Sequence, residues 1–322
     1  MIRFESDYLE GAVPEIMSRL IETNYEQTAG YGTDPYCRAA REKIKLECNA
    51  FDADIHFLVG GTQANLTVIA AALRPHQGVM AAETAHIEAH ETGAIEATGH
   101  KVITLPTTDG KINAADVKNY VLRHRADESF EHIVQPAMVY ISQPTETGTV
   151  YSLPELEELS SVCRELGLIL FADGARLSCA LACEGTPSLS DLARLCDVFY
   201  IGGTKHGALF GEAVVIKNDA IKKDFRYIIK QHGGMFAKGF LFGVQFGAYF
   251  KDGLWLEMAR HAVSQAQRIA KAAEEKGYTL YAKSPTNQVF IVLSHEKIAE
   301  LEQNFAFEAF GHVDDEHEAM RF

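Results

Sequence analysis

A lysine among glycines is the first residue whose surroundings could support chemistry. Lys205 closes the sequence Gly-Gly-Thr-Lys directly after the strand-like run 198–201, where no surface helix needs its charge for solubility. A lysine that is partly desolvated and near a cationic cofactor has a depressed pKa and can form a Schiff base. Thr204 could add a phosphate contact. A lysine in a solvated loop is the alternative interpretation.

A pair of glycines between a strand-like and a helix-like segment is the second candidate. Gly60 and Gly61 would let the backbone approach an anion, which backbone N–H groups and the helix dipole would hold, and the Thr62 hydroxyl adds a donor. The segment is neither a Walker motif nor GxGxxG, which disfavours a dehydrogenase. The alternative is a tight turn with threonine as the helix N-cap.

A carboxylate and an arginine follow the apolar run 168–172. Asp173 would point into a ligand crevice, where it could pair with a protonated ring nitrogen. Arg176 could reach a ring hydroxyl or a substrate carboxylate. An Asx-turn beside a surface arginine is the alternative.

A histidine in the segment ETAHIEAHE is the fourth candidate. The ring of His86 could stack on a pyridine ring, and its nitrogens could move protons near neutral pH. His86 and His90 could also share a helix face for a metal. The sequence is not HExxH and no third ligand is evident, so we predict no metal site.

Strand-length apolar runs alternate with helix-like patterns through most of the chain. This alternation predicts an α/β fold with a mostly parallel, buried central sheet and helices on both faces. The expected strands are 54–59, 101–105, 138–142, 168–172, 198–201 and 213–216, and the expected helices are 62–73, 113–125 and 154–166. The four candidate segments lie at or beside strand ends, where ligands bind in such sheets.

The pattern changes after residue 219. A helical stretch ends near Gln231, and the region 238–276 is mainly helical with a break at Asp252-Gly253. A strand at 289–293, a helix at 295–304 and a short polar tail follow. We assign 1–249 to a large cofactor-binding domain with an N-terminal arm and 250–322 to a small α+β domain, joined by the long helix.

Composition narrows the class of protein. The net charge of −14, from 44 acidic and 30 basic residues, and the lack of a basic stretch with aromatics disfavour nucleic-acid binding. No apolar run approaches membrane length, and the acidic N-terminus lacks a secretion signal, so we expect a cytoplasmic protein. The six cysteines are scattered without a CxxC pair, which favours reduced, buried thiols over a metal site.

Seven motifs in order carry a family resemblance. The chain reads ESDYLEG, GYGTDPY, GGTQAN, AHIEAHETGA, QPTETG, FADGAR and GGTKHGALFGEAVV. This order resembles the threonine aldolase and β-eliminating lyase group of fold-type-I pyridoxal-phosphate enzymes, from near residue 4 to the end. The resemblance implies an aldolase that cleaves threonine or allo-threonine to glycine and acetaldehyde by retro-aldol Cα–Cβ cleavage. A β-eliminating lyase, an aminotransferase and a catalytically silent binding protein remain the alternatives.

The resemblance also assigns roles at the cofactor. Lys205 would carry pyridoxal 5'-phosphate as a Schiff base, and Asp173 would pair with the pyridinium nitrogen. His86 would stack on the cofactor and is the candidate base. The phosphate would be held by Gly61, Thr62 and Thr204.

Further implied residues belong to the substrate and to a second subunit. Ser6, Arg176 and Arg321 match positions that bind the amino-acid substrate's carboxylate or its surroundings, and Tyr31 would lie near the site. The family places its site at the interface of a homodimer, and dimers commonly pair into tetramers. Lys230 or Gln231 would then donate to the neighbouring subunit's phosphate.

Three departures indicate a divergent branch. GGTK replaces a serine-rich segment before the lysine, and QPTET replaces an ENTHN-like loop. The histidine usual in that loop is absent, unless His206 or another residue substitutes for it. The segment GGMFAKG lacks the arginine that follows the methionine in many relatives.

Overall fold

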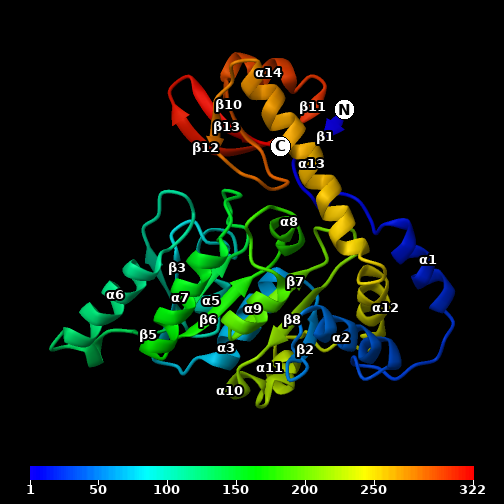
Figure 1. Cartoon of the computed structure of the whole chain (residues 1–322), viewed down its shortest axis with the longest axis vertical. Helices are drawn as coiled ribbons and strands as arrows, with labels where there is room; N and C mark the ends of the chain where they lie inside the picture. Colours follow the sequence, from blue (N-terminus) through cyan, green and yellow to red (C-terminus); the bar gives the residue numbers. More distant parts are fainter.

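A seven-stranded sheet forms the base of the molecule. The computed structural model describes residues 1–322, and the strand order is β2-β8-β7-β6-β5-β3-β4 (Figure 1). Every neighbouring pair is parallel except those of β8, which runs antiparallel to β2 and β7. The strands are β2 Asp54–Leu58, β3 Gln77–Ala82, β4 Lys101–Leu105, β5 Gln135–Ser142, β6 Ile169–Asp173, β7 Val198–Gly202 and β8 Glu212–Ile216. The predicted mostly parallel sheet is confirmed.

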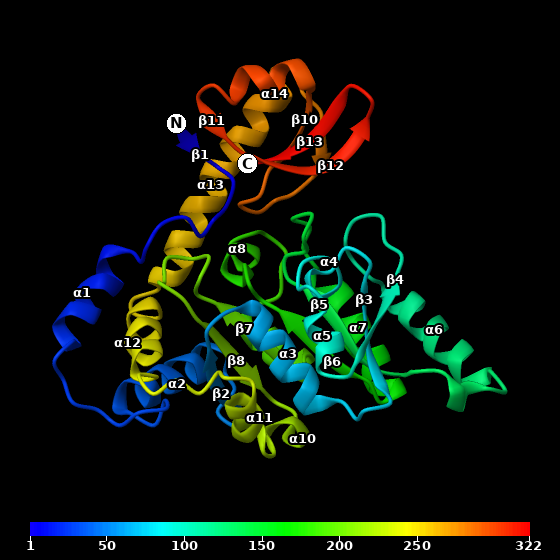
Figure 2. The same cartoon turned by 180° about the vertical axis from the view of Figure 1, so that it is seen from behind.

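Helices cover both faces of this sheet, as the alternation predicted. Helices α6 (Ala114–Ala126), α7 (Leu153–Leu166) and α9 (Leu189–Leu195) lie on the face toward the viewer in Figure 1. The opposite face carries α3 (Gly61–Ala72) and α5 (Ala94–Ala97), with α10 (Asp219–Lys222) and α11 (Phe225–Gln231) packed against α3 (Figure 2). The short helices α4 (His86–Ala89) and α8 (Leu177–Leu181) and the 3-10 turn η1 (Phe130–His132) occupy connections.

Local sequence explains where α7 begins and ends. Ser152 and Glu155 form a reciprocal capping box, and Gly167 ends the helix with a φ of 69°. A serine N-cap stabilises a helix by about 1 kcal/mol, and glycine adopts positive φ without a Cβ clash.

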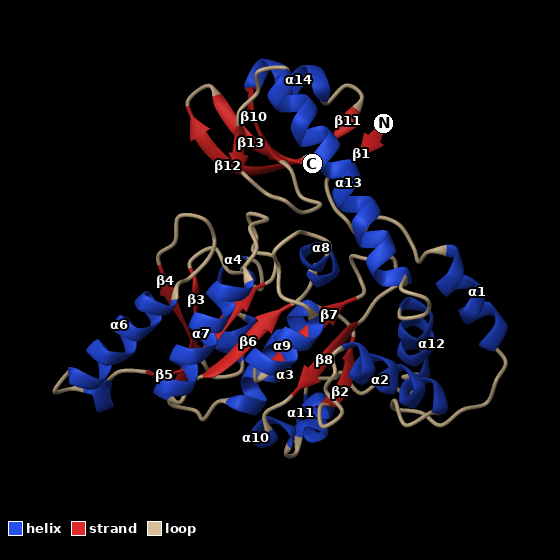
Figure 3. Cartoon of the chain, in the orientation of Figure 1, coloured by secondary structure: helices blue, strands red, loops and turns tan.

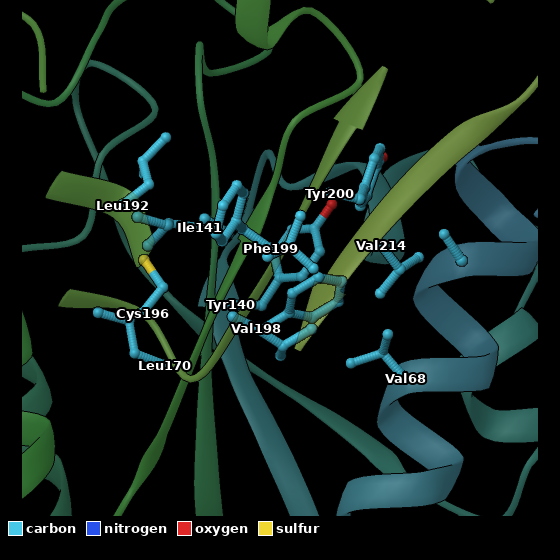
Figure 4. Close-up of a cluster of buried hydrophobic side chains, with 14 of the residues drawn as sticks. Val68, Tyr140, Ile141, Leu170, Leu192, Cys196, Val198, Phe199, Tyr200 and Val214 are labelled. Carbon is cyan, nitrogen blue, oxygen red and sulfur yellow. The ribbon is translucent and has the colours of Figure 1, made fainter. Parts of the chain in front are cut away.

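The core lies between the sheet and its two helical layers. Every residue of β7 and β8 is buried, as expected for a sheet covered on both faces. Figure 4 shows Tyr140, Phe199, Tyr200 and Val214 packed together with Val68 of α3. Strand β3 was not predicted, because its run Gly-Val-Met-Ala-Ala consists largely of small residues without a strand period.

A second helical group flanks the sheet. Helix α12 (Phe240–Tyr249) packs against α1 (Pro14–Thr23) and α2 (Pro35–Glu47), which the sequence analysis did not predict. Helix α12 is apolar on nearly all sides, which is typical of a buried helix. The long α13 (Leu254–Glu275) then leads away from the sheet (Figure 3). No helix combines the length and apolar character that a membrane crossing requires.

The C-terminal residues form a four-stranded antiparallel sheet of order β12-β13-β10-β9. Its elements are β9 Leu280–Ala282, β10 Phe290–Ser294, α14 His295–Leu301, β12 Glu308–Asp314 and β13 His317–Arg321. The expected polar tail is therefore wrong: β12 and β13 form a hairpin that buries Ala319 and Met320 against β10. The N-terminal arm reaches this part, because β1 (Ile2–Arg3) pairs with β11 (Phe305–Ala306).

Candidate active site

A cavity of about 530 Å³ opens at the carboxyl edge of the large sheet, facing the C-terminal sheet. Two glycine turns, the ends of β5 and β6, and β12 and β13 contribute to its wall. Most of the residues that the sequence singled out line it, namely Gly61, Thr62, His86, Asp173, Arg176, Thr204, Lys205 and Arg321. Ser6 and Tyr31 do not.

Close backbone packing positions Lys205. A Cβ on Gly202 would lie 2.3 Å from the carbonyl oxygen of Ala175, so β7 ends directly against the turn that follows Asp173. The Nζ atom of Lys205 lies 5.9 Å from the ring centre of Tyr8. Burial, followed by the positive charge of Arg176, lowers the pKa of Lys205. A lowered pKa provides the neutral amine that attacks a carbonyl carbon.

Asp173, at the end of β6, is held by three donors. Its Oδ2 accepts hydrogen bonds from the Tyr140 hydroxyl at 2.5 Å and from Asn65 Nδ2 at 3.0 Å, and its Oδ1 accepts one from Ala175 N at 2.9 Å. The side chain is buried but lines the cavity. These donors fix the orientation of the carboxyl group, which is in position to pair with a protonated ring nitrogen.

His86 is fixed on the other side of the cavity. Its Nδ1 lies 2.9 Å from Oε1 of Glu91, which also accepts a hydrogen bond from Asn65. Burial opposes a charge on the imidazole, but the hydrogen bond to Glu91 and the charge of Asp173 outweigh it and raise the pKa of His86. With Nδ1 engaged, Nε2 is the nitrogen left for a ligand.

The QPTET loop contributes a carboxyl group at the place where the family resemblance predicts a histidine. Glu146 lines the cavity, and its Oε1 accepts hydrogen bonds from the Ser142 hydroxyl at 2.6 Å and from the backbone N–H of His86 at 2.9 Å. Burial raises the pKa of Glu146. His206 does not substitute for the missing histidine: it lies outside the cavity wall beside Cys179, and burial lowers its pKa to about 4.

The residues that were predicted to hold the cofactor phosphate are not equally available for it. Helix α3 begins at Gly61 with Gly60 as its N-cap and no side-chain cap. The alternative that Thr62 caps the helix is therefore wrong, and its exposed hydroxyl is free for a ligand. The Thr204 hydroxyl instead donates to Glu212 at 2.8 Å and accepts from Gly211 N at 3.0 Å, so it can accept no more than one further bond.

Two arginines line the end of the cavity toward the N-terminal arm. Arg176 forms an ion pair with Asp7 through two hydrogen bonds. Its Nε donates to Asp7 Oδ2 at 2.5 Å, and its Nη2 donates to Asp7 Oδ1 at 3.1 Å. Burial opposes ionisation of Asp7, but the charge of Arg176 outweighs it and holds the pKa of Asp7 below its ordinary value. Arg321 contacts Glu308 and the carbonyl oxygen of Glu5. Ser6 follows Glu5 in the chain and therefore lies close to Arg321, and its buried hydroxyl has no hydrogen-bond partner.

Tyr31 and Lys230 lie together, but away from this cavity. Lys230 Nζ is 5.3 Å from the centre of the Tyr31 ring, which lines a separate small crevice with Arg226 and Arg41. Tyr31 is 47% exposed, so the pair is accessible from outside this chain.

The cavity wall offers the polar groups that pyridoxal phosphate requires. An amine, a carboxylate, an imidazole and a glycine turn at a helix start all border it. Residues of the cavity wall also carry buried polar atoms without a partner, namely the Tyr200 hydroxyl, Glu212 Oε2 and both amide atoms of Gln288. Because buried polar atoms are normally paired, these indicate a polar ligand or water. The residues present fit the cofactor.

Sequence reasoning missed the residues that support this wall. Tyr140, Asn65 and Glu91 act on Asp173 and His86 through hydrogen bonds. Tyr140 lies within β5, Asn65 lies within α3, and Glu91 lies in the connection between α4 and α5, so none stands at a strand's carboxyl end. Glu91 carried a signal, since it follows His86 within the AHIEAHETGA motif. Tyr140 carried none, because a tyrosine in an apolar strand is usually a core residue.

Comparisons with known proteins agree with this architecture. The solved structure of Leishmania major threonine aldolase superposes with a TM-score of 0.97 at 44% identity, covering 100% of this chain and 93% of that one. Cystalysin from Treponema denticola, solved with pyridoxal 5'-phosphate, has a TM-score of 0.75 at 17% identity, covering 100% of this chain and 86% of that one, and shares the fold. The low specificity L-threonine aldolase of Pseudomonas aeruginosa is 34% identical over 93% of this chain and 86% of its own length.

Fold and cavity together define a protein with the fold-type-I architecture of pyridoxal-phosphate enzymes. Within that class the sequence model described as β-eliminating lyase matches residues 3–296, and the chain belongs to this family.

Proposed function

We propose that the protein is a pyridoxal-phosphate-dependent aldolase that cleaves L-threonine, L-allo-threonine and related 3-hydroxy amino acids to glycine and an aldehyde. The observation that carries this proposal is the single cavity bordered by Lys205, Asp173, His86 and Arg176, which come from three separate segments. The names of the relatives from Pseudomonas aeruginosa and Leishmania major support the choice of reaction within the family.

The chain's own residues would hold the cofactor at four points. Lys205 supplies the amine for its aldehyde, Asp173 the carboxylate for its ring nitrogen, and His86 a ring for its face. The Gly61-Thr62 turn supplies N–H groups and a hydroxyl for its phosphate. When bound, pyridoxal phosphate supplies a ring that accepts electrons from bonds at the amino acid's Cα.

Arginine side chains orient the amino acid. Arg176 and Arg321 both line the cavity, and a guanidinium holds a carboxylate in a fixed plane. Fixing the carboxylate selects which Cα bond is aligned for cleavage. The ion pair with Asp7 keeps Arg176 in place. Ser6, which precedes Asp7 in the chain, has a buried, unpaired hydroxyl outside the cavity wall.

His86 would take the proton from the substrate's β-hydroxyl group. Its Nδ1 is held by Glu91, so Nε2 faces the ligand as the basic atom. Removing this proton lets the hydroxyl oxygen form the aldehyde carbonyl as the Cα–Cβ bond breaks. The raised pKa of His86 makes it a stronger base than free imidazole.

One spectrum with one product assay tests the reaction. Purified protein with L-threonine should show a visible absorbance band of the lysine-bound cofactor that shifts on substrate addition, with acetaldehyde released. A band without acetaldehyde would refute the aldolase and favour elimination or transamination. A protein that binds no pyridoxal phosphate would refute the cofactor assignment.

We also infer a cytoplasmic homodimer or homotetramer whose active site lies at the subunit interface. The support is the exposed pair Tyr31 and Lys230, which the family resemblance assigns to the site but which lies away from this chain's own cavity. Light scattering on the eluting protein gives the mass. A monomer that retains full activity would refute the shared site.

A further inference from the structure

A buried carboxyl group that the reaction above does not use lies between the two glycine turns. Glu212 is the first residue of β8, and its register partners are Leu58 on β2 and Gly202 on β7. The chain continues from β2 into 60–61 and from β7 into 203–204. Because β8 runs antiparallel to both neighbours, it begins at the edge where they end. Glu212 is therefore flanked by both turns of the cavity.

One oxygen of Glu212 is left for a ligand. Oε1 accepts the hydrogen bond from the Thr204 hydroxyl at 2.8 Å, whereas Oε2 is buried without a partner in the protein. The residue is 3% exposed and nevertheless lines the cavity. A buried oxygen beside the proposed phosphate turns is in position to meet an anion.

The protonation state decides whether this contact attracts or repels. Burial raises the pKa of Glu212 to about 8, although the Thr204 hydrogen bond and the charge of Lys205 act in the opposite direction. At pH 7 about nine in ten molecules would carry the neutral acid. A neutral carboxylic acid has an O–H donor, whereas a carboxylate is only an acceptor and repels phosphate.

We propose that Glu212 is a phosphate-binding residue that works as a neutral acid, donating a hydrogen bond from Oε2 to the phosphate of the bound cofactor. The proposal rests on the proposed function, which supplies the phosphate. A phosphate dianion beside the group favours the protonated form further, so that phosphate binding and proton uptake are linked. The contribution of Glu212 to phosphate affinity is fully present below the pKa that Glu212 has in the ligand-free protein, and it is lost as the pH rises through that pKa.

Other titratable groups face Glu212 and shape the experiment. Lys205 follows β7, Asp173 ends β6, Tyr200 lies on β7 and Tyr249 lies on α12. Burial raises the pKa of both tyrosines above their ordinary value of 10, so they stay neutral at pH 9. Lys205 is the amine whose deprotonation would also weaken anion binding, so variants must be compared with one another.

Calorimetric titration with pyridoxine 5'-phosphate isolates the phosphate contact, because this compound has the ring and phosphate but no aldehyde for Lys205. The phosphate group of the ligand is dianionic at both pH 7 and pH 9, since a phosphate monoester has a second pKa of about 6. The ring nitrogen of the ligand titrates in the same way with every variant, so its effect cancels when the variants are compared. The full chain, freed of cofactor, should lose about tenfold affinity through Glu212 between these values. Glu212→Gln keeps an N–H donor at every pH. Its affinity for the compound at pH 7 should be within about threefold of the wild-type affinity. Its loss of affinity between pH 7 and pH 9 should be about tenfold smaller than that of the wild type.

Glu146→Gln is the matched control, because it removes a second carboxyl group of the cavity, on the His86 side. Its loss of affinity between pH 7 and pH 9 should equal that of the wild type. Equal losses in wild type and Glu212→Gln would overturn the proposal, as would tighter binding by Glu212→Gln already at pH 7. No binding by the wild type would overturn the cofactor assignment as well.

A second measurement covers the case in which Glu212→Gln does not fold. Titrating Lys205→Met at pH 9 with an alkyl phosphate monoester, which has no ring nitrogen for Asp173, in two buffers of different ionisation enthalpy counts the protons taken up without the contributions of the lysine and the ring. Uptake approaching one proton per site supports the neutral acid. Zero uptake overturns it.

Discussion

Replacing Glu91 by glutamine tests whether the carboxylate sets the basicity of His86. Glu91 is fully buried at its side chain, and its Oε1 accepts hydrogen bonds from both His86 Nδ1 and Asn65 Nδ2. A glutamine oxygen can accept the same two bonds, so the orientation of the imidazole should survive while the negative charge disappears. Because Glu91 raises the pKa of His86, its removal should lower that pKa.

The size of this shift follows from the hydrogen bond. A hydrogen bond to a charged group contributes about 1.5–3 kcal/mol. Solvent reaches His86, whose side chain is 35% exposed, and screening favours the lower end of that range. A loss of about 1.4 kcal/mol corresponds to one pKa unit.

The pH profile of acetaldehyde formation measures the effect. If neutral His86 is the base, the acid limb of kcat/KM for L-threonine should move about one unit to lower pH in Glu91→Gln. Glu88→Gln, which removes an exposed charge from α4, is the matched control and should leave the limb in place. An acid limb that stays at its wild-type position in Glu91→Gln, or that moves equally in both variants, would refute the reasoning.

Three further substitutions test the proposed site and its scaffold. Lys205→Ala should abolish the visible absorbance band and acetaldehyde formation, and a variant that keeps both would disprove the role of this lysine. Asp173→Ala should lower kcat by at least about tenfold, which corresponds to the loss of one charged hydrogen bond of about 1.5 kcal/mol or more. It should destabilise the fold by only about 1–3 kcal/mol in urea unfolding, since Tyr140 and Asn65 lose their acceptor. Gly202→Ala would bring a Cβ within 2.3 Å of a backbone oxygen and should destabilise by about 3 kcal/mol or more. Gly247 lies in helix α12, and a Cβ added there would meet no atom within 4 Å, so Gly247→Ala should not destabilise the protein. Equal losses of stability at both glycines would contradict the packing argument.

The large sheet was predictable because its strands carry their own signal. Runs such as 168–172 and 198–201 are apolar throughout, and a continuous apolar run is the pattern expected of a strand that is buried on both faces. Strand β3 is equally buried, but its small residues fit a helix or a strand. The hairpin of β12 and β13 was missed because its alternating polar residues resemble a solvated tail, and only pairing with β10 shows the buried face.

The chemical residues were predictable where they follow a strand. Lys205 and Asp173 stand directly after apolar runs, so the rule for parallel sheets places them at one edge. Tyr31 was assigned to the site by the family resemblance alone, and in this chain it lies by a different crevice. A motif does not record which face of the chain a loop presents. Partners within elements, such as Asn65 on α3, depend on three-dimensional contacts that spacing does not encode.

The reversed strand β8 explains why Glu212 escaped notice. In a parallel strand the first residue lies at the edge opposite the ligand, so a glutamate that opens a strand reads as a surface charge. Antiparallel β8 inverts this relation and brings its first residue level with Gly202 and Leu58. The same reversal buries the carboxyl group between two turns and raises its pKa to about 8. Strand direction, rather than residue type, therefore determines whether Glu212 belongs to the site.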